Sequence, residues 1–142
     1  MRTQKICLYI AWLLSTLAFI GSIYYSEIRH YYPCTLCWYQ RICLYPLVII
    51  LGVAFFRQVY DVFAYAIAFP AFGLFFSLYH LAIQHIKGFT SLHLCSSLIS
   101  CSAILDAGLG YITIPMLSFV TNLAIFILLF YTRERSINTK SQ

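Results

Sequence analysis

Long stretches without a charged residue are the feature that most restricts how this chain can fold. The nine Lys and Arg and the four Asp and Glu leave five long uncharged runs between them. A helix that crosses the hydrocarbon core of a bilayer needs about 20 predominantly apolar residues. With only 9% charged residues the chain lacks the polar surface of a soluble domain, so a soluble fold is excluded. The runs are residues 6–26, 42–56, 62–86, 88–105 and 107–132.

We therefore predict an all-α fold, an integral membrane four-helix bundle that forms one domain over residues 1–142. The uncharged stretch after Arg41 is too short to cross alone, so the second helix must begin near Cys34 and carry Arg41 inside the membrane. No room is left for a separate soluble domain. The expected helices are about 6–26, 34–56, 62–86 and 111–131, with outer loops at about 27–33 and 87–110.

The distribution of Lys and Arg predicts the orientation. Membrane proteins carry an excess of these residues on the cytoplasmic side. The expected end that holds both termini carries Arg2, Lys5, Arg57, Arg133, Arg135 and Lys140, against Arg29, Arg41 and Lys87 at the other end. Both termini are thus expected in the cytoplasm, and the two loops with cysteines face outward, where disulfides form and persist.

The chain has six cysteines, and four of them fall in the two outer regions as the pairs Cys34/Cys37 and Cys95/Cys101. Cys7 and Cys43 lie inside apolar runs, where a free cysteine behaves as a small hydrophobic residue. Those two are expected to serve packing only.

Residues Pro33 to Arg41 carry the strongest sign of chemistry. Proline favours the first turn of a helix, so Cys34 and Cys37 should lie at a helix N-terminus, where the dipole favours a thiolate. At about 100° per residue Arg41 shares their face, whereas Cys43 points the opposite way. The guanidinium is expected to rise toward Cys37, favouring its thiolate or holding an anionic electron acceptor. The alternative is an arginine that only anchors the helix at the interface.

The second pair requires a bend in the chain. On a continuous helix Cys95 and Cys101 would stand about 9 Å apart along the axis. A disulfide needs Cα atoms within about 7 Å, so irregular backbone is expected if the two pair. Nearby leucines and isoleucines favour a loop that lies on the membrane surface.

Together these segments make the chain resemble a known family, the DsbB-type disulfide bond formation proteins, and in particular the short BdbC-like subgroup. The resemblance covers nearly the whole chain. It rests on Tyr24-Tyr25-Ser26-Glu27-Ile28, on Pro33-Cys34-Thr35-Leu36-Cys37-Trp38-Tyr39-Gln40-Arg41 with Tyr45-Pro46-Leu47, on Tyr111-Ile112-Thr113-Ile114-Pro115-Met116, and on the outer cysteine pair before the last segment.

The resemblance implies a protein of the bacterial inner membrane that reoxidises a DsbA-like thiol oxidase of thioredoxin fold. The electrons then pass to a membrane quinone, either ubiquinone or menaquinone. Cys95 would exchange with the partner's thiol, Cys101 would resolve the mixed disulfide through Cys34, and Cys37 would face the quinone with Arg41 beside the ring. No nucleic acid partner is implied.

Three further polar residues are candidates for the quinone site: Gln40, His80 and Gln84. Gln40 stands where some relatives have an acidic residue, so a proton role for a carboxylate does not transfer to it. His80 and Gln84, one turn apart, could form a wall of the quinone pocket, or they could be polar residues that seek the interface. The chain shows no glycine motif for a nucleotide cofactor, so the electron acceptor must come from the membrane.

Two rival functions remain open. The four outer cysteines could form a zinc or iron-sulfur site, although the wide spacing of Cys95 and Cys101 and the oxidising compartment argue against it. The chain could also be a structural subunit whose cysteines only stabilise its loops. Haem attachment at the CxxC is excluded because Trp38, not His, follows it.

Overall fold

The computed structural model describes residues 2–30, 33–86 and 113–140, and within them four segments are long and apolar enough to span a membrane. The prediction of a four-helix membrane bundle is confirmed. These spans are Thr3–Ile28, Thr35–Arg57, Phe63–His85 and Ile114–Glu134. The elements in chain order are α1 (Arg2–Ile23), the π-helical turn η1 (Tyr24–Ile28), α2 (Thr35–Arg57), α3 (Phe63–Ala66), α4 (Ala68–His85) and α5 (Ile114–Lys140).

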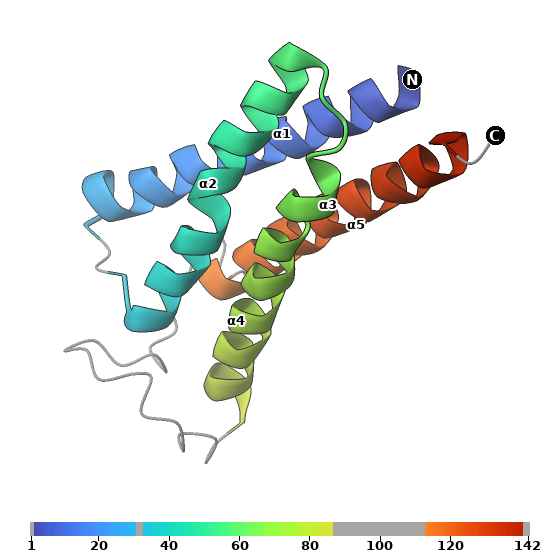
Figure 1. Cartoon of the computed structure of the whole chain (residues 1–142). Coiled ribbons are helices and arrows are strands. Elements are labelled where there is room, and N and C mark those ends of the chain that lie inside the picture. The colour runs from blue at the N-terminus through green and yellow to red at the C-terminus, as the bar shows by residue number, and fades with distance from the viewer. Residues whose placement is uncertain (1, 31–32, 87–112, 141–142) are drawn as a thin grey trace.

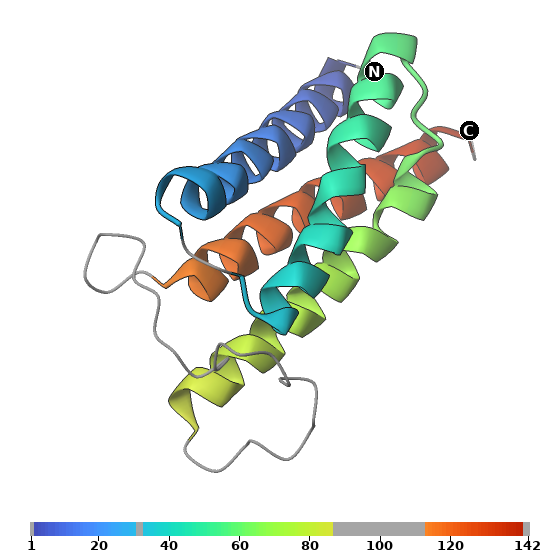
Figure 2. The ribbon, with the colours of Figure 1, turned by 90° about the vertical axis from the view of Figure 1, so that its left-hand side faces the viewer.

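The four spans pack side by side with their ends gathered at two poles (Figure 1). The N-terminus, the C-terminus and the short connection from α2 to α3 lie at one pole. The start of α2 and the end of α4 lie toward the other pole, and Figure 2 shows the same division from the side. Helix α1 packs against α2 and α5, and α4 packs against the same two helices.

Helix α2 crosses as a single helix that includes Arg41, as the charge spacing predicts. Cys34 is its N-cap residue, with extended backbone at φ −70° and ψ 171°. Pro46 lies inside the helix, and the helix stops at Gln58, whose left-handed conformation (φ 56°) closes the C-terminus. The predicted boundaries at 34–56 therefore hold to within one residue.

The third span is not one helix, although a continuous one was expected over 62–86. A turn at Ile67 separates α3 from α4. Pro70 explains the break, because it has no N–H to donate to the carbonyl of Ala66 and its ring crowds that carbonyl. The Ile67 N–H donates to Phe63 at 3.3 Å and the Ala71 N–H donates to Ile67 at 3.3 Å, so the span keeps its direction across the break.

Helix α5 runs to Lys140, and the expected end near Tyr131 is therefore wrong. The polar segment after the apolar run continues the helix because it contains no Pro or Gly to stop it. The start is at Ile114, and the earlier expected start at residue 111 lies outside the described residues.

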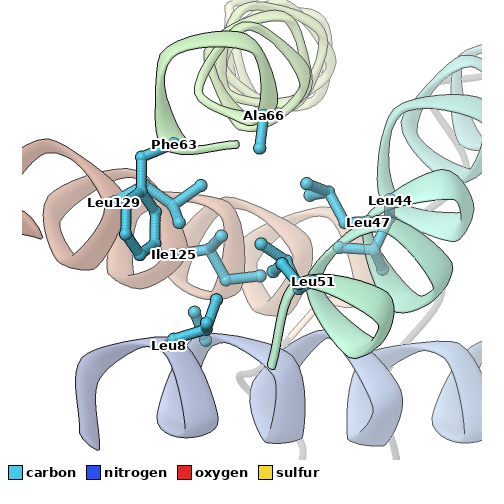
Figure 3. Packing of buried hydrophobic residues seen from close by; sticks show 10 residues of the cluster. Leu8, Leu44, Leu47, Leu51, Phe63, Ala66, Ile125 and Leu129 are labelled. Atoms are coloured by element: carbon cyan, nitrogen blue, oxygen red, sulfur yellow. The ribbon is translucent and has the colours of Figure 1, made fainter. Parts of the chain in front are cut away.

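A cluster of aliphatic side chains holds α1, α2, α3 and α5 together in the half of the bundle near the termini (Figure 3). Burying these side chains in the bundle positions the other half of α2, which carries the cysteines. The labelled members are Leu8, Leu44, Leu47, Leu51, Phe63, Ala66, Ile125 and Leu129.

Helices α4 and α5 approach closely where Gly73 faces Asn122, a fully buried residue. A Cβ at position 73 would overlap the side-chain amide of Asn122. We expect Gly73→Ala to destabilise the bundle by about 1–3 kcal/mol, because it must displace a buried amide that donates to the Ser118 carbonyl at 2.8 Å. Thermal unfolding in detergent would measure this effect.

Gly21→Ala is the matched control, since a Cβ at Gly21 meets nothing within 4 Å. It should leave the unfolding temperature unchanged. Equal unfolding temperatures for both variants would contradict the close packing of α4 on α5.

Candidate functional site

Two thiols stand at the start of α2. Cys34 caps the helix and Cys37 lies in its first turn, and their Sγ atoms are 3.2 Å apart. The pair packs against Leu36 of α2 and Ile83 of α4. The fold thus places both sulfurs at the membrane boundary, close enough to exchange between dithiol and disulfide.

His80 of α4 reaches the same sulfur pair. Its Nε2 atom lies 3.9 Å from Cys34 Sγ, and its Nδ1 atom lies 3.3 Å from Gln40 Nε2. All three side chains are buried, with 3% of His80, 5% of Gln40 and 4% of Cys34 exposed. Gln40 therefore fixes the imidazole ring in the orientation that directs Nε2 at the cysteine.

These contacts favour a thiolate on Cys34. The hydrogen bond with the Cys37 thiol, supported by His80, lowers the pKa of Cys34 to about 4, although burial opposes the shift. The resemblance implies that Cys37 faces the quinone. In the structure it is Cys34 whose thiolate is favoured, through its contacts with Cys37 and His80.

A cavity of about 270 Å³ lies beside the two thiols. Side chains from α1, α2, α4 and α5 line it, and most of the lining is apolar. Leu17 of α1 and Leu117 of α5 line the cavity and are also 58% and 49% exposed. Exposed apolar side chains of these two helices therefore border the cavity. Its polar and sulfur-bearing lining comes from Ser22, Tyr25, Cys34, Cys37, Gln40, Arg41, His80, Gln84, Ser118 and Thr121.

Arg41 lines this cavity together with Cys34 and Cys37, as the helical spacing predicts. Its guanidinium also has contacts that the sequence does not predict. It donates to the Ser22 carbonyl at 3.3 Å and to Ser26 Oγ, and it lies 5.6 Å from the centre of the Trp38 ring. The acceptors on α1 and η1 thus attach the guanidinium to the first span.

The π-helical turn Tyr24–Ile28 is a feature that sequence reasoning missed. It places Ser26 within reach of Arg41, and π-helical turns are frequent at functional sites. The contact of His80 with Gln40 and Cys34 was missed as well. The one sequence signal for this contact is that α2 and α4 both carry polar residues near the same pole of the bundle.

The other sequence-predicted residues divide into two groups. Cys43 is buried and does not line the cavity, in agreement with its predicted position on the opposite face of α2, and Cys7 is half-buried in α1. Cys95 and Cys101, with the bend expected between them, lie outside the described residues. Gln84 lines the cavity one turn beyond His80.

Comparisons with known proteins agree with this arrangement. The family model described as Disulfide bond formation protein DsbB matches residues 4–132. Disulfide bond formation protein C of Bacillus subtilis (strain 168) is 40% identical over 127 residues, which cover 89% of this chain and 92% of that protein. A relative from Coxiella burnetii (strain CbuK_Q154), named "Probable disulfide formation protein", is 40% identical over 134 residues, 92% of this chain and 91% of its own. No solved structure matches the chain significantly.

The matched range, residues 4–132, covers all but the outermost residues of the four spans and contains Cys34, Cys37 and Arg41. The chain therefore belongs to the DsbB family, and it is a multi-pass membrane disulfide oxidoreductase that takes part in disulfide bond formation.

Proposed function

We propose that this protein reoxidises a thioredoxin-fold thiol oxidase outside the membrane and passes the electrons to a membrane quinone. The observation that carries the proposal is the cavity, which is lined by both cysteines and by Leu17 of α1 and Leu117 of α5, whose side chains are also exposed. An electron acceptor dissolved in the bilayer would enter between these two helices and approach Cys37 without entering water.

The cavity fits the headgroup of a quinone and not the whole lipid. Its volume of about 270 Å³ is close to the lower end of ligand pockets, which begin near 300 Å³. Gln40, Arg41 and His80 supply hydrogen-bonding groups around an otherwise apolar lining, as carbonyl oxygens on a ring require. The isoprenoid tail would leave between Leu17 and Leu117.

The orientation proposed for the chain puts the sulfurs outside. The termini and the α2–α3 connection lie at one pole, which collects most of the Lys and Arg residues (Figure 1). The positive-inside rule assigns that pole to the cytoplasm. Cys34 and Cys37, at the start of α2, then face the oxidising side, where a thiol oxidase works.

Each residue has a role in the proposed reaction. Cys95 and Cys101, by resemblance, exchange with the partner's dithiol and reduce the Cys34–Cys37 disulfide. A quinone held in the cavity would take two electrons and two protons from the resulting dithiol and would leave as the quinol, while the S–S bond re-forms between Cys34 and Cys37. Arg41 would supply positive charge beside the ring, and the contacts that favour a thiolate on Cys34 prepare that sulfur for bond formation with Cys37. Gln40 and His80 hold the Cys34 sulfur in place for that step.

An external acceptor is required on energetic grounds. A thiol oxidase with a reduction potential of about −120 mV is reoxidised only by a couple of at least comparable potential, and about 30 mV corresponds to 1.4 kcal/mol for two electrons. Two protein disulfides alone cannot sustain turnover against such a partner.

The direct test combines the purified protein, a reduced thioredoxin-fold thiol oxidase and a quinone in lipid nanodiscs. We expect catalytic oxidation of the partner, with one quinone reduced for each disulfide formed. A single turnover that quinone does not extend would contradict the proposal and would favour a structural role for the cysteines.

A smaller cavity should weaken quinone binding. Gly21 lines the cavity and has open space at its Cβ position, so Gly21→Phe places a ring there without displacing the backbone. We expect the KM for quinone to rise about tenfold or more, while the single-turnover oxidation of the partner stays unchanged. Steady-state quinone reduction at varied quinone content would measure it.

Ile20→Phe is the matched control, because Ile20 is 56% exposed and does not line the cavity. Its KM should equal that of the unmodified protein. Equal KM values for Gly21→Phe and Ile20→Phe would place the quinone elsewhere.

A further inference from the structure

A three-residue cluster around the thiols has a second chemical capacity. Cys34 Sγ, Cys37 Sγ and a ring nitrogen of His80 all lie within 4.8 Å of one another. Two thiolates and an imidazole are the ligands that Zn²⁺ and Cd²⁺ prefer among protein side chains. We propose that the reduced protein binds one such thiophilic divalent cation at Cys34, Cys37 and His80, and that the bound cation blocks the dithiol.

The distances suit a tetrahedral ion. With Zn–S bonds of about 2.3 Å and Zn–N bonds of about 2.0–2.1 Å, ligand atoms in a tetrahedron stand about 3.5–3.8 Å apart. The observed separations are 3.2 Å between the sulfurs and 3.9 Å from Cys34 Sγ to His80 Nε2, and Cys37 Sγ lies within 4.8 Å of a His80 ring nitrogen. Side-chain shifts of up to about 1.3 Å therefore create the site.

Gln40 provides the support that metal-binding histidines usually have. A histidine that ligates through one ring nitrogen is held by a hydrogen bond at the other. The Gln40 side chain already lies 3.3 Å from His80 Nδ1. With the Gln40 amide turned by 180° and the proton on Nδ1, the Nδ1–H would donate to Gln40 Oε1, and the lone pair of Nε2 would ligate the metal.

Charge and access also favour the cation. Two thiolates neutralise a divalent ion, so the complex adds no net charge to a buried site. All three ligands line the cavity, which leaves a fourth position for water. Binding releases the thiol protons and transfers no electrons, and the disulfide form offers no thiolates. The site therefore exists only in the reduced state, and an occupied site cannot return to the disulfide.

The test uses the full chain with Cys95→Ser and Cys101→Ser, so that the second pair binds no metal. The protein is reduced with a phosphine and titrated with Cd²⁺ without oxygen, and the ultraviolet charge-transfer band of thiolate–Cd²⁺ is followed. We expect one Cd²⁺ per chain. Zn²⁺ affinity comes from competition with a chromophoric chelator, and the oxidised protein should bind neither ion.

His80→Ala should weaken Zn²⁺ binding by about 100-fold, and Gln40→Ala by about tenfold. His85→Ala is the matched control, because this residue ends the same helix with an exposed side chain, and its affinity should not change. Equal affinities for His80→Ala and His85→Ala would overturn the proposal.

X-ray absorption of the Zn²⁺-loaded Cys95→Ser, Cys101→Ser protein, without a further substitution, provides a measurement that needs no histidine variant. We expect two sulfur ligands, one imidazole and one further light atom. A coordination shell without imidazole scattering would overturn the site, and neither result depends on quinone or on the thiol oxidase.

Discussion

Cys37→Ala is expected to abolish quinone-dependent oxidation of the partner, with a loss of at least about 1,000-fold. The Cys37 sulfur lies 3.2 Å from Cys34 and lines the cavity, so it is both half of the exchangeable pair and the sulfur beside the proposed acceptor. Without it no disulfide can form at this end of α2, and the two electrons from the partner's thiols cannot pass to the quinone. Partner oxidation and quinone reduction, recorded together in nanodiscs, would measure the loss.

Cys43→Ala is the control within the same helix. Cys43 is buried but does not line the cavity, so its variant should keep activity close to that of the unmodified protein. Substantial turnover by Cys37→Ala, or complete loss in Cys43→Ala, would contradict the assignment of the working face of α2.

Arg41→Ala should slow quinone reduction by about 10- to 100-fold, because a hydrogen bond from a charged group contributes about 1.5–3 kcal/mol. The guanidinium lines the cavity and is held between Trp38 and two acceptors, one on α1 and one on η1. Exchange between the oxidised protein and one equivalent of reduced partner, measured without quinone, should change little. The variant therefore separates the two halves of the reaction.

Two controls separate the effect of the Arg41 charge on activity from the effect of its contact with the first span. Ser26→Ala removes one acceptor and keeps the charge, so it should lose less activity than Arg41→Ala. Arg57→Ala changes an exposed arginine at the far end of α2 and should have no effect on quinone reduction. If Arg41→Ala slowed both half-reactions equally, its main contribution would be to the packing of α1 on α2.

The spans could be predicted from sequence because charge spacing and bilayer thickness determine them. The same spacing required Arg41 to lie within α2, and helical periodicity placed it on the face of Cys34 and Cys37. The break at Ile67 was missed because the uncharged run 62–86 predicts one continuous helix, which Pro70 interrupts. A proline disturbs the helix one turn before its own position, because here the carbonyl of Ala66 loses its hydrogen-bond donor.

The details of the site depend on contacts between helices that are distant in sequence. His80 meets Cys34 and Gln40 across 46 and 40 residues, and periodicity within one helix does not predict such pairs. The course of Arg41 toward α1 depends on the π-helical turn, whose extra residue per turn leaves no signature in the hydrophobic pattern. Helix α5 continues past its apolar stretch because polar residues can be helical outside the bilayer.

Leu17 and Leu117 border the cavity on the two helices between which the proposed quinone enters, so the entrance lies within the bilayer. A substrate that enters through this entrance arrives by diffusion in two dimensions, while the protein partner arrives from water in three. The effective quinone concentration is then its mole fraction among lipids, and adding empty vesicle or micelle material at constant total quinone should slow turnover by surface dilution. Kinetic constants given per litre would differ between preparations of the same protein.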